Sequence, residues 1–538
     1  MKYFGWIFLF FVIVYILPLG SRPLVIPEYK FAESAREMVL SGDYVTPRLR
    51  GETVVSTPAP AYYPAAKAIQ LFGKNDFAVR FPSALSAGLT ALFIWILIAQ
   101  VLRDEKLAAL SAIIYLTSSA IYTSGTIATT GALFAMLCTG SCGTIFIALQ
   151  EAKLNRRKAL NLILGGIFAG FGFITGGVSA LLIPLLSGVI YMMWDKKLRQ
   201  LPSLLFAVPV IAALTALPWV LAVNRMEPGF LCSFVRQEFA SFCNWESLVP
   251  WYLPLYLFAL GSFPSALLIP AAGVVGKEAW RGFLRQPLFR FAFCFLFIPL
   301  IIATLNPSWD TNVILCSFAP LALLIAAGIR VYFNSGGHHR SYNWLMTAWG
   351  ILLAAGGAGL AVLHFTKPEY LKNIPLTGLF YPVMGTVLII AGTMMIYSAI
   401  GNWRSRLYLY FAGIGLVLLF MPWFFKGNVL MPGEALRDLG RRCQLTDNSK
   451  YTVVADNPAL ADAAAWEFDF KNIRTPNTLT TGKVPVTTPK ILFIGNRIEG
   501  AKSIPGMEKS GNYLNVQEIT ADPLQMLIFD LTAAPEKP

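Results

Sequence analysis

The side chains best able to do chemistry gather in one polar segment near the start of the chain, residues 20–75. The ionisable residues of interest in this segment and just beyond it are Glu28, Glu33, Arg36, Asp43 and Arg80. Each has an ordinary structural interpretation. An acid such as Glu28 is favoured at a helix N-terminus by the helix dipole, and Glu33 and Asp43 can cap and brace a loop. The two arginines can extend along an apolar surface or pair with Glu37 and Asp76.

Cysteine and histidine offer little further chemistry. Four of the seven cysteines fall in apolar runs, where buried thiols pack as small hydrophobic residues: Cys138, Cys142, Cys294 and Cys316. Cys232 and Cys243 share one polar loop and could form a disulfide in an oxidising compartment. His338 and His339 lie beside Arg340 in another loop, and no Cys/His group has metal-ligand spacing. The sequence therefore predicts no metal site and no cofactor.

Composition identifies the environment of the chain. Of its 538 residues, 56% are hydrophobic and only 13% are charged, whereas soluble domains carry about 25% charged residues. The formal net charge is +14, but Lys and Arg lie in short loops between long apolar runs. They form no basic stripe with interleaved aromatic residues of the kind that binds nucleic acid. This pattern indicates a multi-pass membrane protein and argues against a nucleic-acid partner.

Apolar runs predict about thirteen transmembrane helices. The first is Phe4–Leu19, which we interpret as an uncleaved helix because no small-residue cleavage site follows it. The others lie near residues 81–102, 107–124, 130–149, 160–175, 177–194, 203–223, 252–275, 287–304, 311–329, 343–364, 376–399 and 407–425. Some of these runs are short or adjoin one another, so the predicted count of helices is thirteen to within about one.

Loop charges predict the orientation. We number the loops between predicted spans from the N-terminus. The even-numbered loops carry clusters of Lys and Arg, such as Lys153–Lys158 and Lys277–Arg290. The short odd-numbered loops near Ser124, Gly176 and Asn306 have none. Cytoplasmic loops are the ones enriched in Lys and Arg. The N-terminus is thus predicted to be cytoplasmic, and an odd number of spans places the C-terminal region on the outer side.

Two regions outside the membrane stand out. In the first outer loop, about residues 20–80, the segments Glu28–Leu40 and Tyr62–Phe72 have helical amphipathic spacing and are predicted to lie at the membrane interface. Residues 426–538 are predicted to form a small extracytoplasmic α/β domain after a membrane domain of residues 1–425. Its expected elements are a helix at Gly433–Cys443 and strands at Tyr451–Ala455 and Lys490–Gly495.

The first outer loop also carries a family resemblance. The runs PEYKFAESAREM (27–38), SGDYVTP (41–47) and LFGKNDFAVRFPSAL (71–85) resemble the aminoarabinose transferases of lipid A. These enzymes belong with the protein mannosyltransferases in the GT-C glycosyltransferase superfamily. Shorter matches continue at ATTGAL (128–133), GFITGG (172–177), Pro218-Trp219, Pro228–Phe230 and APLA (319–322). The resemblance implies an all-α GT-C-type membrane fold with interfacial helices in the first outer loop and an outer C-terminal domain.

The resemblance also implies a chemistry. The family transfers a sugar from a polyprenyl phosphate donor, with a carboxylate acting on the acceptor and Lys and Arg holding the departing lipid phosphate. Carried over to this chain, Glu28 is the candidate base if the protein is active. The candidates for binding substrate and phosphate are Arg36, Arg80, Glu33 and Asp43. The implied donor is a polyprenyl-phosphate-linked sugar in the bacterial inner membrane.

The chain departs from the family pattern at its charged motifs. Pro27-Glu28 stands where the family has Asp-Glu, and Ser56-Thr57-Pro58 stands for Glu-Lys-Pro. Gly131 replaces the Asp of the second outer loop, and Gly176-Gly177-Val178 replaces Lys-Gly-Pro. Ser308–Thr311 takes the place of Ser-Lys-Leu-Pro. Charged residues are therefore lost while the residues that shape the backbone remain.

Three functions fit these observations. The first is a catalytically degenerate member that binds a lipid-linked sugar or another lipid, or serves an intact paralogous transferase as a partner. The second is an active transferase that uses Glu28 as base. The first-loop helices are expected to enclose a pocket on the outer side, and we expect Glu28 to point away from it because Pro27 fixes the local backbone. The third is a transporter, which is disfavoured because the predicted spans contain almost no ionisable residues.

Overall fold

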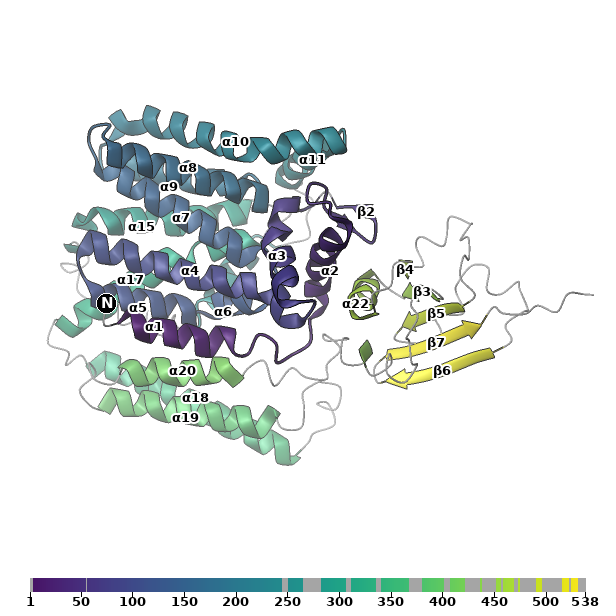
Figure 1. Ribbon diagram of the computed structural model, residues 1–538. Coiled ribbons are helices and arrows are strands. Elements are labelled where there is room, and N and C mark those ends of the chain that lie inside the picture. Colours follow the sequence, from purple (N-terminus) through teal and green to yellow (C-terminus); the bar gives the residue numbers. More distant parts are fainter. Residues whose placement is uncertain are drawn as a thin grey trace, which may run out of the picture.

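The computed structural model has a helical bundle with a small sheet beyond one end (Figure 1). It describes residues 3–54, 56–243, 250–264, 282–305, 311–334, 340–366, 380–400, 407–420, 436–437, 451–455, 458–468, 473–474, 490–495, 515–521 and 524–530. The predicted inner-loop pair His338–His339 and the segment Ser308–Asp310 lie outside the described residues. Among the residues that the structure describes, no group of three or more His, Cys, Asp or Glu side chains could hold a metal ion.

Most helices of the bundle follow the predicted apolar runs, and one, at Phe230–Cys243, lies in a predicted outer loop. They are α4 (Asp76–Leu102), α5 (Glu105–Thr117), α6 (Ser119–Thr126), α7 (Gly131–Gln150), α8 (Arg156–Gly176), α9 (Ser179–Trp194), α10 (Leu201–Met226), α11 (Phe230–Cys243), α12 (Leu253–Gly261), α15 (Pro287–Leu305), α16 (Thr311–Leu315), α17 (Phe318–Asn334), α18 (Arg340–Thr366), α19 (Phe380–Ile400) and α20 (Leu407–Phe420). A chain with such helices buries its backbone polar groups in lipid without leaving them unpaired.

Six of the described helices are long and apolar enough to cross a membrane, or seven if α5 and α6 form one span. The predicted run 107–124 is broken at Ser118, where α5 and α6 meet at 65°. Several other apolar helices are shorter, among them α9. The membrane class of the chain is confirmed, whereas the count of thirteen stays a prediction.

The first predicted span is a helix with a change of pitch. It begins as α1 (Phe4–Phe11) and continues as a π-helix, η1 (Val12–Ile16). Its fully buried Tyr15 hydroxyl donates a hydrogen bond to the Leu116 carbonyl at 2.7 Å. That bond fixes the first helix against α5, so the segment is an integral part of the bundle.

Small residues permit the closest helix contact in the bundle. Along α18 and α19, a Cβ added at Gly357 would lie 2.5 Å from the Gly385 carbonyl oxygen. One added at Gly392 would lie 2.5 Å from the Gly350 carbonyl oxygen. The two backbones therefore touch, as small residues permit between membrane helices.

The first loop contains two helices, α2 (Ile26–Ser41) and α3 (Tyr63–Phe72), with η2 (Ala59–Tyr62) and a short hairpin, β1 (Arg48–Leu49) and β2 (Glu52–Thr53). Both helices were predicted at nearly these bounds. Gly42 ends α2 with a φ of 71°, a left-handed conformation that glycine adopts without strain. The polar face predicted for α2 is not solvated, because Glu33 and Arg36 are buried together with the apolar face.

The C-terminal region forms a mixed sheet of order β4-β3-β5-β7-β6 with one described helix. Its elements are β3 (Tyr451–Ala455), α22 (Pro458–Phe468), β4 (Ile473–Arg474), β5 (Lys490–Gly495), β6 (Asn515–Ala521) and β7 (Leu524–Asp530). β3 is parallel to β4 and β5, and β7 is antiparallel to β5 and β6. The strands predicted at 451–455 and 490–495 are confirmed. α22, β4, β6 and β7 were not foreseen, and most of the predicted helix at 433–443 lies outside the described residues.

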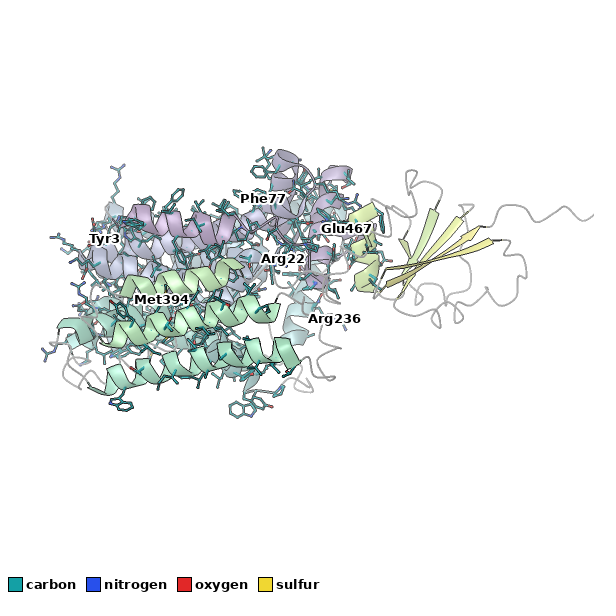
Figure 2. The ribbon with its side chains drawn as sticks, turned by 90° about the horizontal axis from the view of Figure 1, so that it is seen from below. Tyr3, Arg22, Phe77, Arg236, Met394 and Glu467 are labelled. Atoms are coloured by element: carbon teal, nitrogen blue, oxygen red, sulfur yellow. The ribbon has the colours of Figure 1, made fainter. Side chains whose placement is uncertain are left out.

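The first-loop helices and α22 lie at the same end of the bundle. Figure 1 shows α2 and α3 between the long helices and α22. Figure 2 places Tyr3 and Glu467 at opposite ends of the helical bundle. The N-terminus and the C-terminal sheet therefore lie on opposite sides of the bundle.

Candidate functional site

Glu28 lies in the first turn of α2 and is completely buried. Its Oε2 accepts a hydrogen bond from the Val25 backbone N–H at 2.7 Å, as expected for an acid that caps a helix N-terminus. Its Oε1 accepts one from the Ala128 backbone N–H at 2.7 Å. The carboxylate therefore joins the start of α2 to the loop between α6 and α7.

Two guanidinium groups complete the surroundings of Glu28. Arg80 Nε and Nη2 bind its two oxygens at 2.7 Å each, and Arg22 Nη1 lies 3.4 Å from Oε2. Burial alone would raise the pKa of Glu28, but Arg80, Arg22 and the Val25 N–H outweigh it and lower that pKa. Glu28 is thus an ionised, fully coordinated carboxylate, which makes it a poor general base.

The hydrogen-bond donors of Arg80 are also fully used. Besides Glu28, its Nη1 donates to the carbonyl oxygens of Leu19 and Arg22 at 2.9 and 2.8 Å, and its Nη2 donates to Pro23 at 2.8 Å. A guanidinium has five N–H groups, and these contacts use all five. The side chain is 0% exposed. Arg80 therefore holds the chain after the first helix against α4, and it has no N–H left for a phosphate. Its predicted partner Asp76 instead pairs with Arg437.

Arg22 belongs to this site and was missed by the sequence analysis. Its Nη2 donates to the Thr126 carbonyl at 3.1 Å, and it is 8% exposed. The signal available was a lone arginine between apolar residues at the end of the first helix. Arg22, Arg80 and Glu28 together carry one positive charge in excess. We call these three side chains the Glu28 cluster.

The other predicted site residues lie elsewhere in the first loop. Arg36 forms a two-pronged ion pair with Glu33, with N–O distances of 2.6 and 2.8 Å, rather than with Glu37. Asp43 Oδ1 accepts the backbone N–H groups of Val45 and Thr46 at 2.9 and 3.1 Å. These residues cap and brace the loop, and none of them is hydrogen-bonded to the Glu28 cluster in the described contacts.

Two of the substituted motif positions are closed by neighbouring side chains. A Cβ at Gly131 would lie 2.5 Å from Asn312 Oδ1 and 2.9 Å from Leu315 Cδ1. A Cβ at Gly176 would lie 2.2 Å from the Phe134 ring. Real Cβ atoms do not approach other atoms so closely, so the space that an Asp or Lys would need is occupied. Cys232, in α11, is an exposed free thiol. The Cys243 side chain lies outside the described part of the structure, so the possible disulfide between the two stays a prediction.

Comparison with known proteins finds a matching family and a similar fold. The family described as dolichyl-phosphate-mannose-protein mannosyltransferase matches residues 56–222. The crystal structure of ArnT from Cupriavidus metallidurans bound to undecaprenyl phosphate superposes with a TM-score of 0.78. It covers 99% of both chains at 16% sequence identity. The chain thus has the GT-C-type fold that the resemblance implied.

Sequence relatives narrow the class to a family. The undecaprenyl phosphate-α-4-amino-4-deoxy-L-arabinose arabinosyl transferase of Pectobacterium atrosepticum is 30% identical over 86% of this chain and 83% of its own length. The protein of the same name from Aeromonas salmonicida is 33% identical over 66% of this chain. That match spans 65% of the Aeromonas protein. The chain belongs to the family of undecaprenyl phosphate-aminoarabinose arabinosyl transferases, and it is a multi-pass membrane protein.

Proposed function

We propose that this chain is a member of the aminoarabinosyl transferase family that binds a polyprenyl-phosphate-linked sugar in the bacterial inner membrane but has lost turnover. The observation that carries the proposal is the coordination of Glu28. Each of its oxygens already accepts at least two hydrogen bonds, and both arginines beside it are buried. A base in this state cannot take a proton from an acceptor without breaking the cluster.

Arg22 supports the binding half of the proposal. Its two described contacts use two of its five N–H groups, and the Glu28 cluster has one uncompensated positive charge. A buried excess charge is costly unless an ion of opposite sign approaches. A lipid phosphate at the outer end of the bundle would compensate it through charge-assisted hydrogen bonds.

The closed positions at Gly131 and Gly176 support the loss of turnover. Removing one positioned acid or base typically costs about 10²–10⁴ in rate, and this chain lacks several charged groups of the family pattern. The names of the relatives favour the second function, an active transferase that moves a sugar from undecaprenyl phosphate to lipid A or another outer acceptor, with Glu28 as base.

One experiment separates the two functions. Purified full-length protein is incubated with a panel of undecaprenyl-phosphate sugars, including the 4-amino-4-deoxy-arabinose donor, and both binding and transfer to lipid A are measured. We expect saturable binding without transfer, and weaker binding for Arg22→Gln than for Arg199→Gln, which changes an exposed control arginine between α9 and α10. Transfer above that of a heat-inactivated sample would refute the loss of turnover. Failure to bind any donor would refute the binding function.

We also propose the finer topology of the chain. It has about thirteen spans with a cytoplasmic N-terminus, and residues 426–538 form an extracytoplasmic domain. The placement of the N-terminus and the sheet at opposite ends of the bundle supports this arrangement. A paralogous transferase is a candidate partner. A reporter that is active only in the cytoplasm should be silent when fused to the C-terminal end, and a strong signal would show that the span count is wrong by an odd number.

A further inference from the structure

Helix α22 packs onto the first-loop helices through a buried apolar face. Its buried residues are Leu460, Ala461, Ala463, Ala464 and Trp466, and they share one core cluster with Tyr29, Ala32 and Ala35 of α2. Trp466 is among the largest fully buried side chains of the protein, and Lys74 lies over its ring at 5.2 Å. The C-terminal region is therefore fixed to the same loop that carries Glu28.

Charged residues surround this apolar contact. Arg437 bonds Asp76, the first residue of α4, at 2.9 and 3.0 Å, and it bonds Glu467 at the end of α22 at 2.8 and 3.1 Å. The Tyr29 hydroxyl of α2 lies 3.2 Å from Glu467 Oε1. One arginine thus bridges a carboxylate of the bundle and a carboxylate of α22.

A second carboxylate of α22 faces α2 and the hairpin. Asp462 Oδ1 lies 3.2 Å from Arg50 Nε, and the Asp462 side chain is 8% exposed. The charges of Lys30 and Glu33 on α2 also act on Asp462, and Glu33 is itself paired with Arg36. Asp462 is therefore a buried acid with one direct cationic partner and a second acid nearby.

We propose that the contact between α22 and the first loop is a proton-sensitive clamp that tightens as the surrounding pH falls. We call Asp462, Glu467 and their partners Arg50, Arg437 and Asp76 the clamp residues. Nothing in the proposed sugar-lipid binding requires such a clamp, so the inference goes beyond it. Its consequence is that acidification on the side where α22 lies holds the first loop, and with it the Glu28 cluster, more firmly in place.

The direction follows from the titration of the clamp carboxylates. Burial raises the pKa of Asp462 from its ordinary 3.8 to about 6, although Arg50 opposes the rise. Burial also raises the pKa of Glu467, although Arg437 opposes it. A group that holds its proton more tightly when clamped favours the clamped state at low pH and opposes it at high pH. For Asp462 alone, the ratio of open to clamped protein rises about tenfold between pH 5 and pH 7.5.

Hydrogen exchange of the α22 amides measures that ratio. Full-length protein in lipid nanodiscs is compared at the two pH values, after correction for the intrinsic pH dependence of exchange. We expect the opening equilibrium of α22 in the wild type to rise about tenfold from pH 5 to pH 7.5. Asp462→Asn keeps the shape of the side chain but cannot titrate, so its opening equilibrium should rise less than that of the wild type, and the remaining rise comes from Glu467. The double variant Asp462→Asn and Glu467→Gln should have a nearly constant opening equilibrium. Glu52→Gln, which removes an exposed carboxylate in the adjacent hairpin, should behave like the wild type.

A wild-type opening equilibrium that is constant or falls with pH would overturn the proposal, and this result needs no variant to fold. A tenfold rise retained in the double variant would also overturn it, because the titrating group would then lie outside the two clamp carboxylates. If Asp462→Asn does not fold, the carboxyl stretching band of Asp462 decides instead, followed by infrared spectroscopy in protein labelled with ¹³C-aspartate. A midpoint near the ordinary 3.8 would contradict the clamp.

Discussion

Replacing Glu28 by glutamine tests the central geometry of the site. Glu28 Oε1 accepts hydrogen bonds from Arg80 Nε and the Ala128 N–H, and Oε2 accepts them from Arg80 Nη2 and the Val25 N–H. In Glu28→Gln, an NH2 group replaces one of the two carboxylate oxygens. Each oxygen accepts at least two hydrogen bonds, so in either orientation the NH2 group faces at least two donors that it cannot accept from. The two buried arginines also lose their only counter-charge within the cluster.

The magnitude follows from burial. Breaking a buried ion pair by removing one partner costs about 3–5 kcal/mol, because the remaining charge is left uncompensated. Both Glu28 and Arg80 are 0% exposed, so solvent does not reduce this cost. The sequence offered Asp76 as a partner of Arg80, but the structure pairs Arg80 with Glu28 instead.

The assay is reversible unfolding of the full-length protein by dodecyl sulfate titration in bicelles. We expect Glu28→Gln to lower the free energy of unfolding by about 3–5 kcal/mol. Because the pKa of Glu28 is lowered, the stabilising pair is complete above the ordinary pKa of 4.5 and is lost only below it. The cost should therefore be the same at pH 6 and pH 8.

Two controls make the result decisive. Glu52→Gln removes an exposed carboxylate of the same loop and should change stability by no more than about 0.5 kcal/mol. Glu28→Gln combined with Arg80→Met should cost less than the sum of the two single changes, because one stranded charge is removed. A loss below about 1 kcal/mol for Glu28→Gln, well under the cost of breaking a buried pair, would refute the proposed coordination.

Three further predictions follow from the same contacts. Arg80→Lys should lose about 1–3 kcal/mol in the same unfolding assay, because an ammonium cannot reach the five acceptor positions of the guanidinium; wild-type stability would contradict the five-bond geometry. Gly131→Asp should lose no more than about 1 kcal/mol, because the atoms it meets are the movable ends of Asn312 and Leu315 and the dipole favours an acid in the first turn of α7; a loss above about 3 kcal/mol would show that these side chains cannot move. Arg437→Met should lower the free energy of opening of α22, measured by hydrogen exchange, by at most about 1 kcal/mol, because the Arg437 side chain is 38% exposed. Unchanged exchange would show that Arg437 is not part of the clamp.

Part of the site could be predicted from the sequence, because local chemistry decides it. Pro27 followed by Glu28 in front of an amphipathic run is a helix start, and the structure places α2 there with Glu28 as its capping acid. The bracing role of Asp43 likewise depends on backbone N–H groups only two and three residues away. Short-range contacts of this kind can be predicted from residue type and spacing.

The membrane fold was determined by the sequence for a similar reason. Long apolar runs with charges confined to loops have one stable solution in lipid, because helices satisfy every backbone polar group internally. The run between Gly131 and Gln150 is an example: its predicted and observed bounds differ by one residue at each end. Family membership was likewise visible in the motifs of the first loop.

Only the tertiary structure decided the partners of the charged residues. Arg80 pairs with Glu28, 52 residues away, although Asp76 lies within one helical turn of it. Arg437 pairs with Asp76 from the other end of the chain. Two conditions decide which ion pairs form. The packed helices must bring the two side chains within reach, and the pair must be shielded from water. Neither condition is local, and for that reason the sequence could show the charges of this protein but not their partners.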